Sequence, residues 1–164
     1  MTDDAEFGGY FPGALGQMAT LHAVHYAASH GLGQVFEARV ARDIGDLLLR
    51  FNPSRDFHRT ARADGRLLAS ITIDGHGYPD AHLRCFIVAP EARGRGLGRR
   101  LLADAIDFCR AQGFSRIYLW TLAGLEPAGQ LYRDAGFRLV EEHPGEQWGK
   151  RLVEQVLEMH LTVA

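Results

Sequence analysis

Glycines and arginines alternate over residues 93–99, and this short segment constrains the fold of the chain more than any other. The residues before it, Ala81–Val88, are apolar on nearly both faces, which predicts a central strand that Pro90 ends. The residues after it carry apolar side chains at helical spacing as far as Gln112. A strand, a glycine-rich turn and a helix in this order predict an α/β fold with a ligand at the helix N-terminus.

The chemistry of this turn favours a phosphate ligand. Backbone N–H groups at a helix N-terminus have no partners inside the helix and carry partial positive charge. Glycines let the main chain approach a ligand closely, and arginines add charge-assisted hydrogen bonds. The arginines are Arg93, Arg95, Arg99 and Arg100. The alternative is a solvated glycine-arginine turn that binds nothing.

The spacing of the glycines argues against two common classes of phosphate ligand. A P-loop requires a Lys-Ser or Lys-Thr pair after its last glycine, and none follows Gly98. The dinucleotide fingerprint requires GxGxxG after the first strand, whereas Gly94, Gly96 and Gly98 are evenly spaced and come late in the chain. Neither a nucleoside triphosphate nor a dinucleotide is therefore expected.

The remaining pattern predicts an α/β (α+β) domain over residues 1–164, with a central mixed sheet of six to seven strands flanked by about four helices. Two helices come first, at Gly13–Gly31 and Val35–Phe51. A short helix starts at Pro127 and ends at Gly136. The predicted strands are Phe57–Ala63, Arg66–Asp74, Ala81–Val88, Arg116–Leu122, Phe137–Glu142 and Glu154–Val163, with a weak one near Phe7–Tyr10.

Composition excludes several classes of protein. A formal net charge of −2 and a pI of about 6.4 exclude binding of nucleic acid by electrostatic attraction. No apolar run reaches the roughly 18 residues of a membrane-spanning helix, and the acidic N-terminus is unlike a signal peptide. Cys85 and Cys109 lie among apolar residues, as reduced thiols do. We expect a cytoplasmic domain with neither a nucleic-acid nor a membrane partner.

Two motifs carry a resemblance to a known family. Arg93-Gly94-Arg95-Gly96-Leu97-Gly98 resembles the acyl-CoA signature (Gln/Arg)-x-x-Gly-x-(Gly/Ala) of the GNAT N-acetyltransferases, and Leu131–Phe137 (LYRDAGF) resembles their LY-x-x-x-GF motif. A helix and a strand separate the two motifs, as in the family. The overall sequence, including Ala81–Val88, Leu119-Trp120-Thr121 and Gly145-Glu146-Gln147-Trp148-Gly149, is similar to the acetyltransferase domain of MarR–GNAT fusion proteins. Since the chain has no room for the DNA-binding half, we expect an enzyme rather than a regulator.

The resemblance implies acetyl-CoA as co-substrate, with its pyrophosphate on the glycine loop and its pantetheine arm between splayed strands. Attack by a substrate amine would give a tetrahedral intermediate and expel the CoA thiolate. Many relatives contact the cofactor through an asparagine where this chain has Leu125, so Thr121 or the backbone near Gly124 has to replace that contact. The implied cofactor-binding residues are Phe86, Ile87, Val88, Arg93, Gly94, Arg95, Gly96, Leu97, Gly98, Arg99 and Thr121.

The resemblance assigns Tyr132 as the general acid, because a phenol can donate a proton to a departing thiolate. The alternative is a tyrosine that only packs on the sheet. For the base, Glu37 lies beside the apolar stripe of the second helix. His25, His30 and His82 are weaker candidates, and the strand where many relatives place a catalytic glutamate carries none. The expected acceptor contacts are His22, Tyr26, Arg84, Trp120 and Trp148.

Three functions fit these residues. The first is transfer of an acetyl group from acetyl-CoA to the amine of a small or amino-acid-like molecule. The second is acetylation of a protein lysine or N-terminus, and the third is a silent acyl-CoA sensor. A closed cavity near Trp148 would favour the small molecule, and an open groove would favour a peptide. No metal is predicted, because His22-x-x-His25 lacks further ligands at metal spacing. A homodimer through the closing strands is common in the family.

Overall fold

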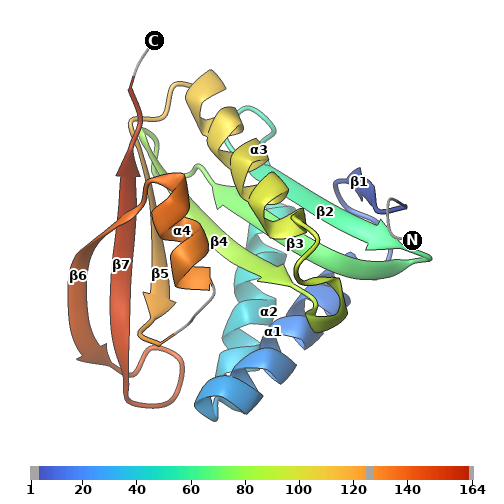
Figure 1. The fold of residues 1–164 in the computed structure, drawn as a ribbon, viewed down its shortest axis with the longest axis vertical. Coiled ribbons are helices and arrows are strands. Elements are labelled where there is room, and N and C mark those ends of the chain that lie inside the picture. The colour runs from blue at the N-terminus through green and yellow to red at the C-terminus, as the bar shows by residue number, and fades with distance from the viewer. Residues whose placement is uncertain (1–3, 125–127, 163–164) are drawn as a thin grey trace.

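The computed structural model describes residues 4–124 and 128–162, which form one seven-stranded sheet with helices on both faces (Figure 1). The predictions at Leu125 and Pro127 therefore lie outside the described residues. The helices are α1 (Ala14–His30), α2 (Gln34–Leu49), the 3-10 turn η1 (Pro90–Ala92), α3 (Leu97–Ala111) and α4 (Ala128–Ala135). The strands are β1 (Glu6–Gly8), β2 (Phe57–Ala63), β3 (Arg66–Asp74), β4 (Asp80–Val88), β5 (Arg116–Leu122), β6 (Arg138–Gly145) and β7 (Leu152–His160).

The sheet is mixed, as predicted. Its strand order is β1-β2-β3-β4-β5-β7-β6, and β4 and β5 pair in parallel while the other neighbours pair antiparallel. The weak strand near Phe7–Tyr10 is present as β1 and makes the seventh. The last two strands are shifted from the predicted ranges by one to three residues. Alternation alone does not fix where a strand stops when a polar loop joins two strands.

The second helix ends two residues before the predicted position. Phe36, Val40, Ile44 and Leu47 of the predicted stripe are buried against the sheet. Phe51 was expected to continue this stripe, but the helix ends at Leu49 and Phe51 is 38% exposed. The hydrogen bonds from the backbone N–H groups of Arg55 and Asp56 to the carbonyl of Asn52 form a separate turn there. The turn diverts the chain from the helical path.

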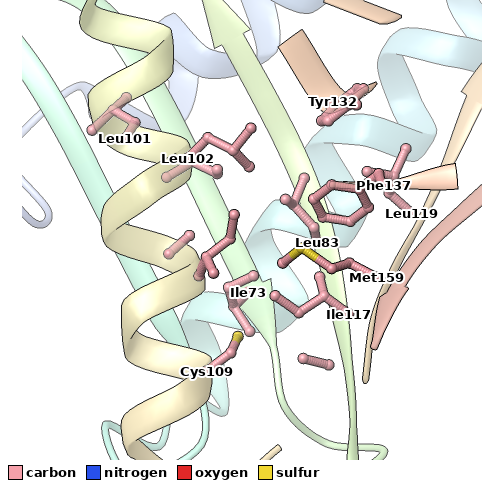
Figure 2. Close-up of a cluster of buried hydrophobic side chains, with 14 of the residues drawn as sticks. Ile73, Leu83, Leu101, Leu102, Cys109, Ile117, Leu119, Tyr132, Phe137 and Met159 are labelled. Atoms are coloured by element: carbon pink, nitrogen blue, oxygen red, sulfur yellow. The ribbon is translucent and has the colours of Figure 1, made fainter. Parts of the chain in front are cut away.

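The helices divide between the two faces of the sheet. In Figure 1, α3 and α4 lie in front of the sheet and α1 and α2 lie behind it. The larger buried cluster lies under α3 and α4 and joins Leu101, Leu102 and Cys109 to the inward side chains of the central strands (Figure 2). A second cluster packs α1 against α2 on the opposite face. Each face thus has its own core, and the central strands are covered on both sides.

None of the helices among the described residues is both long and apolar enough to cross a membrane.

Candidate active site

Strands β4 and β5 part in the middle of the sheet. They pair at only three positions, from Asp80 opposite Arg116 to His82 opposite Tyr118. In Figure 1 the two strands start together at the top of the view and diverge downward. The rest of β4, from Leu83 to Val88, therefore turns an edge toward β5 without ladder hydrogen bonds to it. Such an edge can accept an extended ligand as an added strand.

A bulge re-aims β4 at the point where the strands separate. The register with β3 jumps from Ser70 opposite Ile87 to Thr72 opposite Arg84, so β4 holds one extra residue there. Cys85 carries the strain, with φ of 53°. The Thr72 hydroxyl donates a 2.6 Å hydrogen bond to the carbonyl of Arg84, which fixes the bulge. As a result Cys85 packs toward α1 and α2, and the next residue packs toward α3 and α4.

The glycine-arginine segment forms the tight entry to α3 that the sequence predicts. Gly94 and Gly96 have φ of 80° and 77°, in the left-handed region where glycine is strongly preferred, and Gly96 caps the helix. The Arg93 guanidinium lies 3.2 Å from His25 Nδ1 of α1, within hydrogen-bonding distance. The loop is thus tied to the helix on the other side of the sheet. Gly96, Leu97 and Gly98, at the start of α3, line the same cavity as the parted strands.

A cavity of about 680 Å³ runs from this loop through the gap to the space beneath α1 and α2. It collects residues from α1, α2, β4, the glycine loop, β5, α4 and the β6–β7 loop. Most of the predicted site residues line it, namely Tyr132, Phe86, Ile87, Val88, Arg93, Gly94, Gly96, Leu97, Gly98, Arg99, Thr121, His22, Tyr26, Arg84, Trp120 and Trp148. The structure therefore brings residues from most of the chain length into one site.

Two predicted site residues are not brought to the cavity. Arg95 is exposed in the glycine loop and is not among the lining residues. Glu37 is exposed near the start of α2, and the helix instead presents Phe36, Val40 and Asp43 to the cavity. At 100° per residue Asp43 lies about 20° from Phe36 around the helix, whereas Glu37 lies about 100° away. The carboxylate that α2 supplies to this site is therefore Asp43, which the sequence reasoning missed.

Tyr132 is held firmly at the inner wall. It follows Leu131 on α4, is 7% exposed, and packs edge-on against Phe86 and Phe137 with ring centroids 6.0 and 5.7 Å away. Figure 2 shows it at one end of the buried cluster. Burial raises the pKa of this phenol above its ordinary value of 10, and the neighbouring Tyr26 acts in the same direction. Tyr132 is therefore a protonated donor throughout the neutral pH range.

His82 lies at the point where β4 and β5 begin to separate. Its ring stacks on Tyr118 with centroids 4.5 Å apart, at the last pair of residues that join the two strands. Burial lowers the pKa of His82 to about 4, and the nearby positive charge of Arg84 acts in the same direction. The imidazole is therefore neutral at pH 7 and has a lone pair to accept a proton.

Arg84 belongs to a chain of ion pairs across the acceptor side of the cavity. Its guanidinium contacts Asp43 at 3.1 Å and Asp74 at 3.2 Å. Asp74 is buried and also accepts two hydrogen bonds from Arg50, at 2.7 and 3.2 Å. Burial alone would raise the pKa of Asp74, but the hydrogen bond from Arg50 and the charges of both arginines hold it below its ordinary value. Arg84 and Asp43 are the two members of this network on the cavity wall.

The loop between β6 and β7 reaches across to the two N-terminal helices. Lys150 Nζ donates a 2.9 Å hydrogen bond to the carbonyl of His30, the last residue of α1. Gly149 has φ of 90° and lies close to Val35. A Cβ atom added at Gly149 would be only 2.8 Å from the Cβ atom of Val35. Trp148 packs against the cluster between α1 and α2. These contacts place the β6–β7 loop against α1 and α2 on the acceptor side of the cavity.

His22 has a structural partner although it lines the cavity. It is 5% exposed, and its Nδ1 lies 2.7 Å from the carbonyl of Met18, to which it donates. Burial lowers its pKa to about 4. Over residues 4–124 and 128–162, no three His, Cys, Asp or Glu side chains are grouped so that they could hold a metal ion.

Comparison with known proteins agrees with this geometry. Residues 35–137 match the model of the Acetyltransferase (GNAT) family, so the chain belongs to the GNAT acetyltransferases. The fold is also that of yncA from Salmonella typhimurium, solved with its cofactor acetyl-CoA, at a TM-score of 0.71 and 17% identity over 98% of this chain and 95% of that one.

Two curated relatives differ in how much of their length is matched. A mycothiol acetyltransferase of Beutenbergia cavernae is 36% identical over 93 residues, which are 57% of this chain and 31% of that protein. An uncharacterized N-acetyltransferase of Schizosaccharomyces pombe is 28% identical over 120 residues, 72% of this chain and 73% of that protein. The chain thus spans about a third of the first relative and most of the second.

Proposed function

We propose that the chain catalyses acetyl-CoA-dependent N-acetylation of a small-molecule amine. The observation that carries the proposal is the continuous cavity from the glycine loop, past Tyr132, to the space beneath α1 and α2. One end offers donors for a pyrophosphate and the other offers room for an acceptor. A binding module without catalysis would not need a buried proton donor between the two.

The residues present fit acetyl-CoA. Gly94 and Gly96 hold the loop in a conformation that presents backbone N–H groups, while Arg93 and Arg99 line the same end of the cavity. The unpaired edge of β4 can hydrogen-bond an extended pantetheine arm in the manner of a strand. Bound there, acetyl-CoA supplies the reactive thioester.

Two side chains of the protein, His82 and Tyr132, then transfer the protons of the reaction. His82 is neutral and lies where β4 and β5 separate, so it can take a proton from the incoming ammonium, directly or through a water molecule. The proposal gives the role of base to His82 in place of Glu37, because Glu37 is outside the cavity. Tyr132 donates toward the departing sulfur, since its phenol stays protonated at neutral pH.

The β6–β7 loop supports a small molecule over a protein substrate. The contacts of Lys150 and Gly149 join this loop to α1 and α2, and the loop narrows the acceptor side that a peptide would have to enter. The resemblance to the acetyltransferase domain of MarR–GNAT fusions belongs to the same proposal, as does a cytoplasmic location, where Cys85 and Cys109 stay reduced.

Release of CoA thiol in the presence of a panel of amines tests this function. The panel would contain amino acids, arylalkylamines, polyamines and a lysine peptide, with the purified chain and acetyl-CoA. Turnover with small amines and little with the peptide is the expected result. Calorimetric binding of acetyl-CoA without turnover of any amine would instead support the sensor, and efficient turnover of the peptide would support a protein acetyltransferase.

A further inference from the structure

We propose that the acceptor is a free α-amino acid with a large apolar or aromatic side chain. Its carboxylate binds Arg84, its ammonium group lies beside Asp43, and its side chain extends toward Phe36 and Trp148. This inference rests on the proposed function and names the substrate class of the same site. It follows from the order of side chains along the cavity wall.

The first step is that Arg84 and Asp43 present opposite charges side by side. Their closest atoms are 3.1 Å apart, and the side chains are 27% and 34% exposed. Both line the cavity, so part of each remains accessible to a ligand. Asp74 also pairs with Arg84, at 3.2 Å, but it is buried, it is shared with Arg50, and it is not among the residues that line the cavity. The wall thus offers one cation and one anion as a neutral pair.

A zwitterion complements such a pair better than a simple ion does. A lone carboxylate approaching Arg84 would meet the repulsion of Asp43, and a lone ammonium approaching Asp43 would meet that of Arg84. An α-amino acid carries both charges on adjacent groups and can face each of them with its opposite. The planar guanidinium is suited to a carboxylate because it offers parallel N–H donors.

The second step is the change from polar to apolar along α2. Phe36, Val40 and Asp43 all line the cavity, at spacings of four and three residues on one side of the helix. Phe36 is in ring contact with Tyr26, at 4.9 Å between centroids, and lies in the cluster against which Trp148 packs. At 1.5 Å per residue, about 10 Å of helix separates Phe36 from Asp43. A large side chain that starts beside Asp43 covers much of that distance, and a small one leaves the apolar end empty.

The third step is the position of the amine. Arg84 immediately precedes the bulge at Cys85, where β4 turns its free edge into the gap. A carboxylate on Arg84 therefore brings the α-amine next to that edge and to His82. In the reaction the N–C bond of the amide forms and the C–S bond of the thioester breaks. Of the two protons that the ammonium loses, one ends on the CoA thiol and the other leaves through His82 to solvent.

Matched pairs of acceptors test the inference on the unmodified protein. The values of kcat/KM for phenylalanine and tryptophan would be compared with those for phenethylamine, tryptamine, phenylalanine amide and glycine. We expect the amino acids to exceed their decarboxylated partners by about tenfold or more, since a charged hydrogen bond is lost with the carboxylate. We also expect glycine to be a poor acceptor.

The variant Arg84→Gln should remove this preference by raising KM for the amino acids and lowering KM for the decarboxylated amines, whose ammonium group no longer meets the repulsion of Arg84 beside Asp43. Arg116→Gln is the matched control, because Arg116 is also ion-paired but lies outside the cavity, and it should keep the preference. Equal turnover of amines with and without the carboxylate would overturn the inference and leave the proposed function standing. If acetyl-CoA neither binds nor turns over, both fail.

Discussion

Lys150 Nζ donates a hydrogen bond to the main-chain carbonyl of His30, 2.9 Å away, and so joins the loop between β6 and β7 to the end of α1. Lys150 is the single lysine of the chain. The contact links two segments 120 residues apart at the acceptor end of the cavity. The same loop carries Trp148 into the cavity wall.

Removing this link should weaken acceptor binding with little effect on the cofactor. In Lys150→Met the loop loses one hydrogen bond from a charged group, worth about 1.5 kcal/mol or somewhat more. We expect a severalfold increase in KM for the amine and an unchanged affinity for acetyl-CoA, measured by initial rates and calorimetry. Arg151→Gln, at the next exposed position, is the control. A weaker affinity for acetyl-CoA alone would contradict the assigned place of the loop.

Tyr132→Phe should lower kcat by about 10²-fold or more, the usual contribution of a general acid. Phenylalanine retains the packing against Phe86 and Phe137, so both folding and acetyl-CoA affinity should be kept. Thiol-release kinetics and a thermal melt would measure these effects. Tyr78→Phe removes an exposed hydroxyl outside the cavity and should leave kcat alone. Unchanged turnover in Tyr132→Phe would show that another group donates the proton.

Gly96→Ala should weaken acetyl-CoA binding. Gly96 has φ of 77° at the N-cap of α3, and an alanine there costs about 1–2 kcal/mol of strain or forces the turn to rearrange. Calorimetry should show an affinity lower by about tenfold. Gly16→Ala is the matched control, because Gly16 lies inside α1 with open space around it. Equal losses in both variants would mean that the effect is not specific to the loop.

Stability should fall as the pH is lowered from about 6.5 to 4. The pKa values of His22 and His82 are lowered to about 4 by burial, so in this window the unfolded chain binds more protons than the folded one. Each histidine should cost on the order of 2 kcal/mol of unfolding free energy between pH 7 and pH 5. Urea melts at the two pH values measure this loss. His82→Gln should reduce the loss of unfolding free energy at low pH. An unchanged pH dependence in this variant would contradict the contribution assigned to His82.

Asp74→Asn should destabilise the fold more than Asp43→Asn does. Asp74 is buried and binds both Arg50 and Arg84, whereas Asp43 is a third exposed. Loss of a buried partner leaves charges uncompensated and costs about 3 kcal/mol, although the exposed edge of Arg50 reduces this. Urea denaturation of the two variants gives the comparison. Equal effects would mean that Asp74 is not the central anion of the network.

Local patterns in the sequence are sufficient for most of the fold. The stripe from Phe36 to Leu47 predicts a helix with one buried side, and the strands predicted at Phe57–Ala63 and Arg66–Asp74 are present as the β2–β3 hairpin. The predicted glycine-rich turn before α3 is present, and Gly94 and Gly96 adopt φ above zero in it. Each of these features depends on residues that are close together in the sequence, and each is present in the structure.

The acceptor side depends on long-range contacts and was harder to predict. Glu37 and Asp43 both flank the stripe of α2, and only the helical angle from Phe36 and the docking of the helix over Arg84 select Asp43. The bulge at Cys85 arises from a register jump against β3 that β4 alone does not encode. Likewise, the contact of Lys150 with His30 joins distant segments whose meeting no local pattern indicates.

Calorimetric titration of the purified chain with acetyl-CoA tests the central claim most directly, because every step assigned to the cavity requires the cofactor to lie between the glycine loop and the parted strands. The account predicts saturable binding at one site with micromolar affinity, weakened in Gly96→Ala and retained in Tyr132→Phe. The absence of binding by the unmodified chain would contradict it.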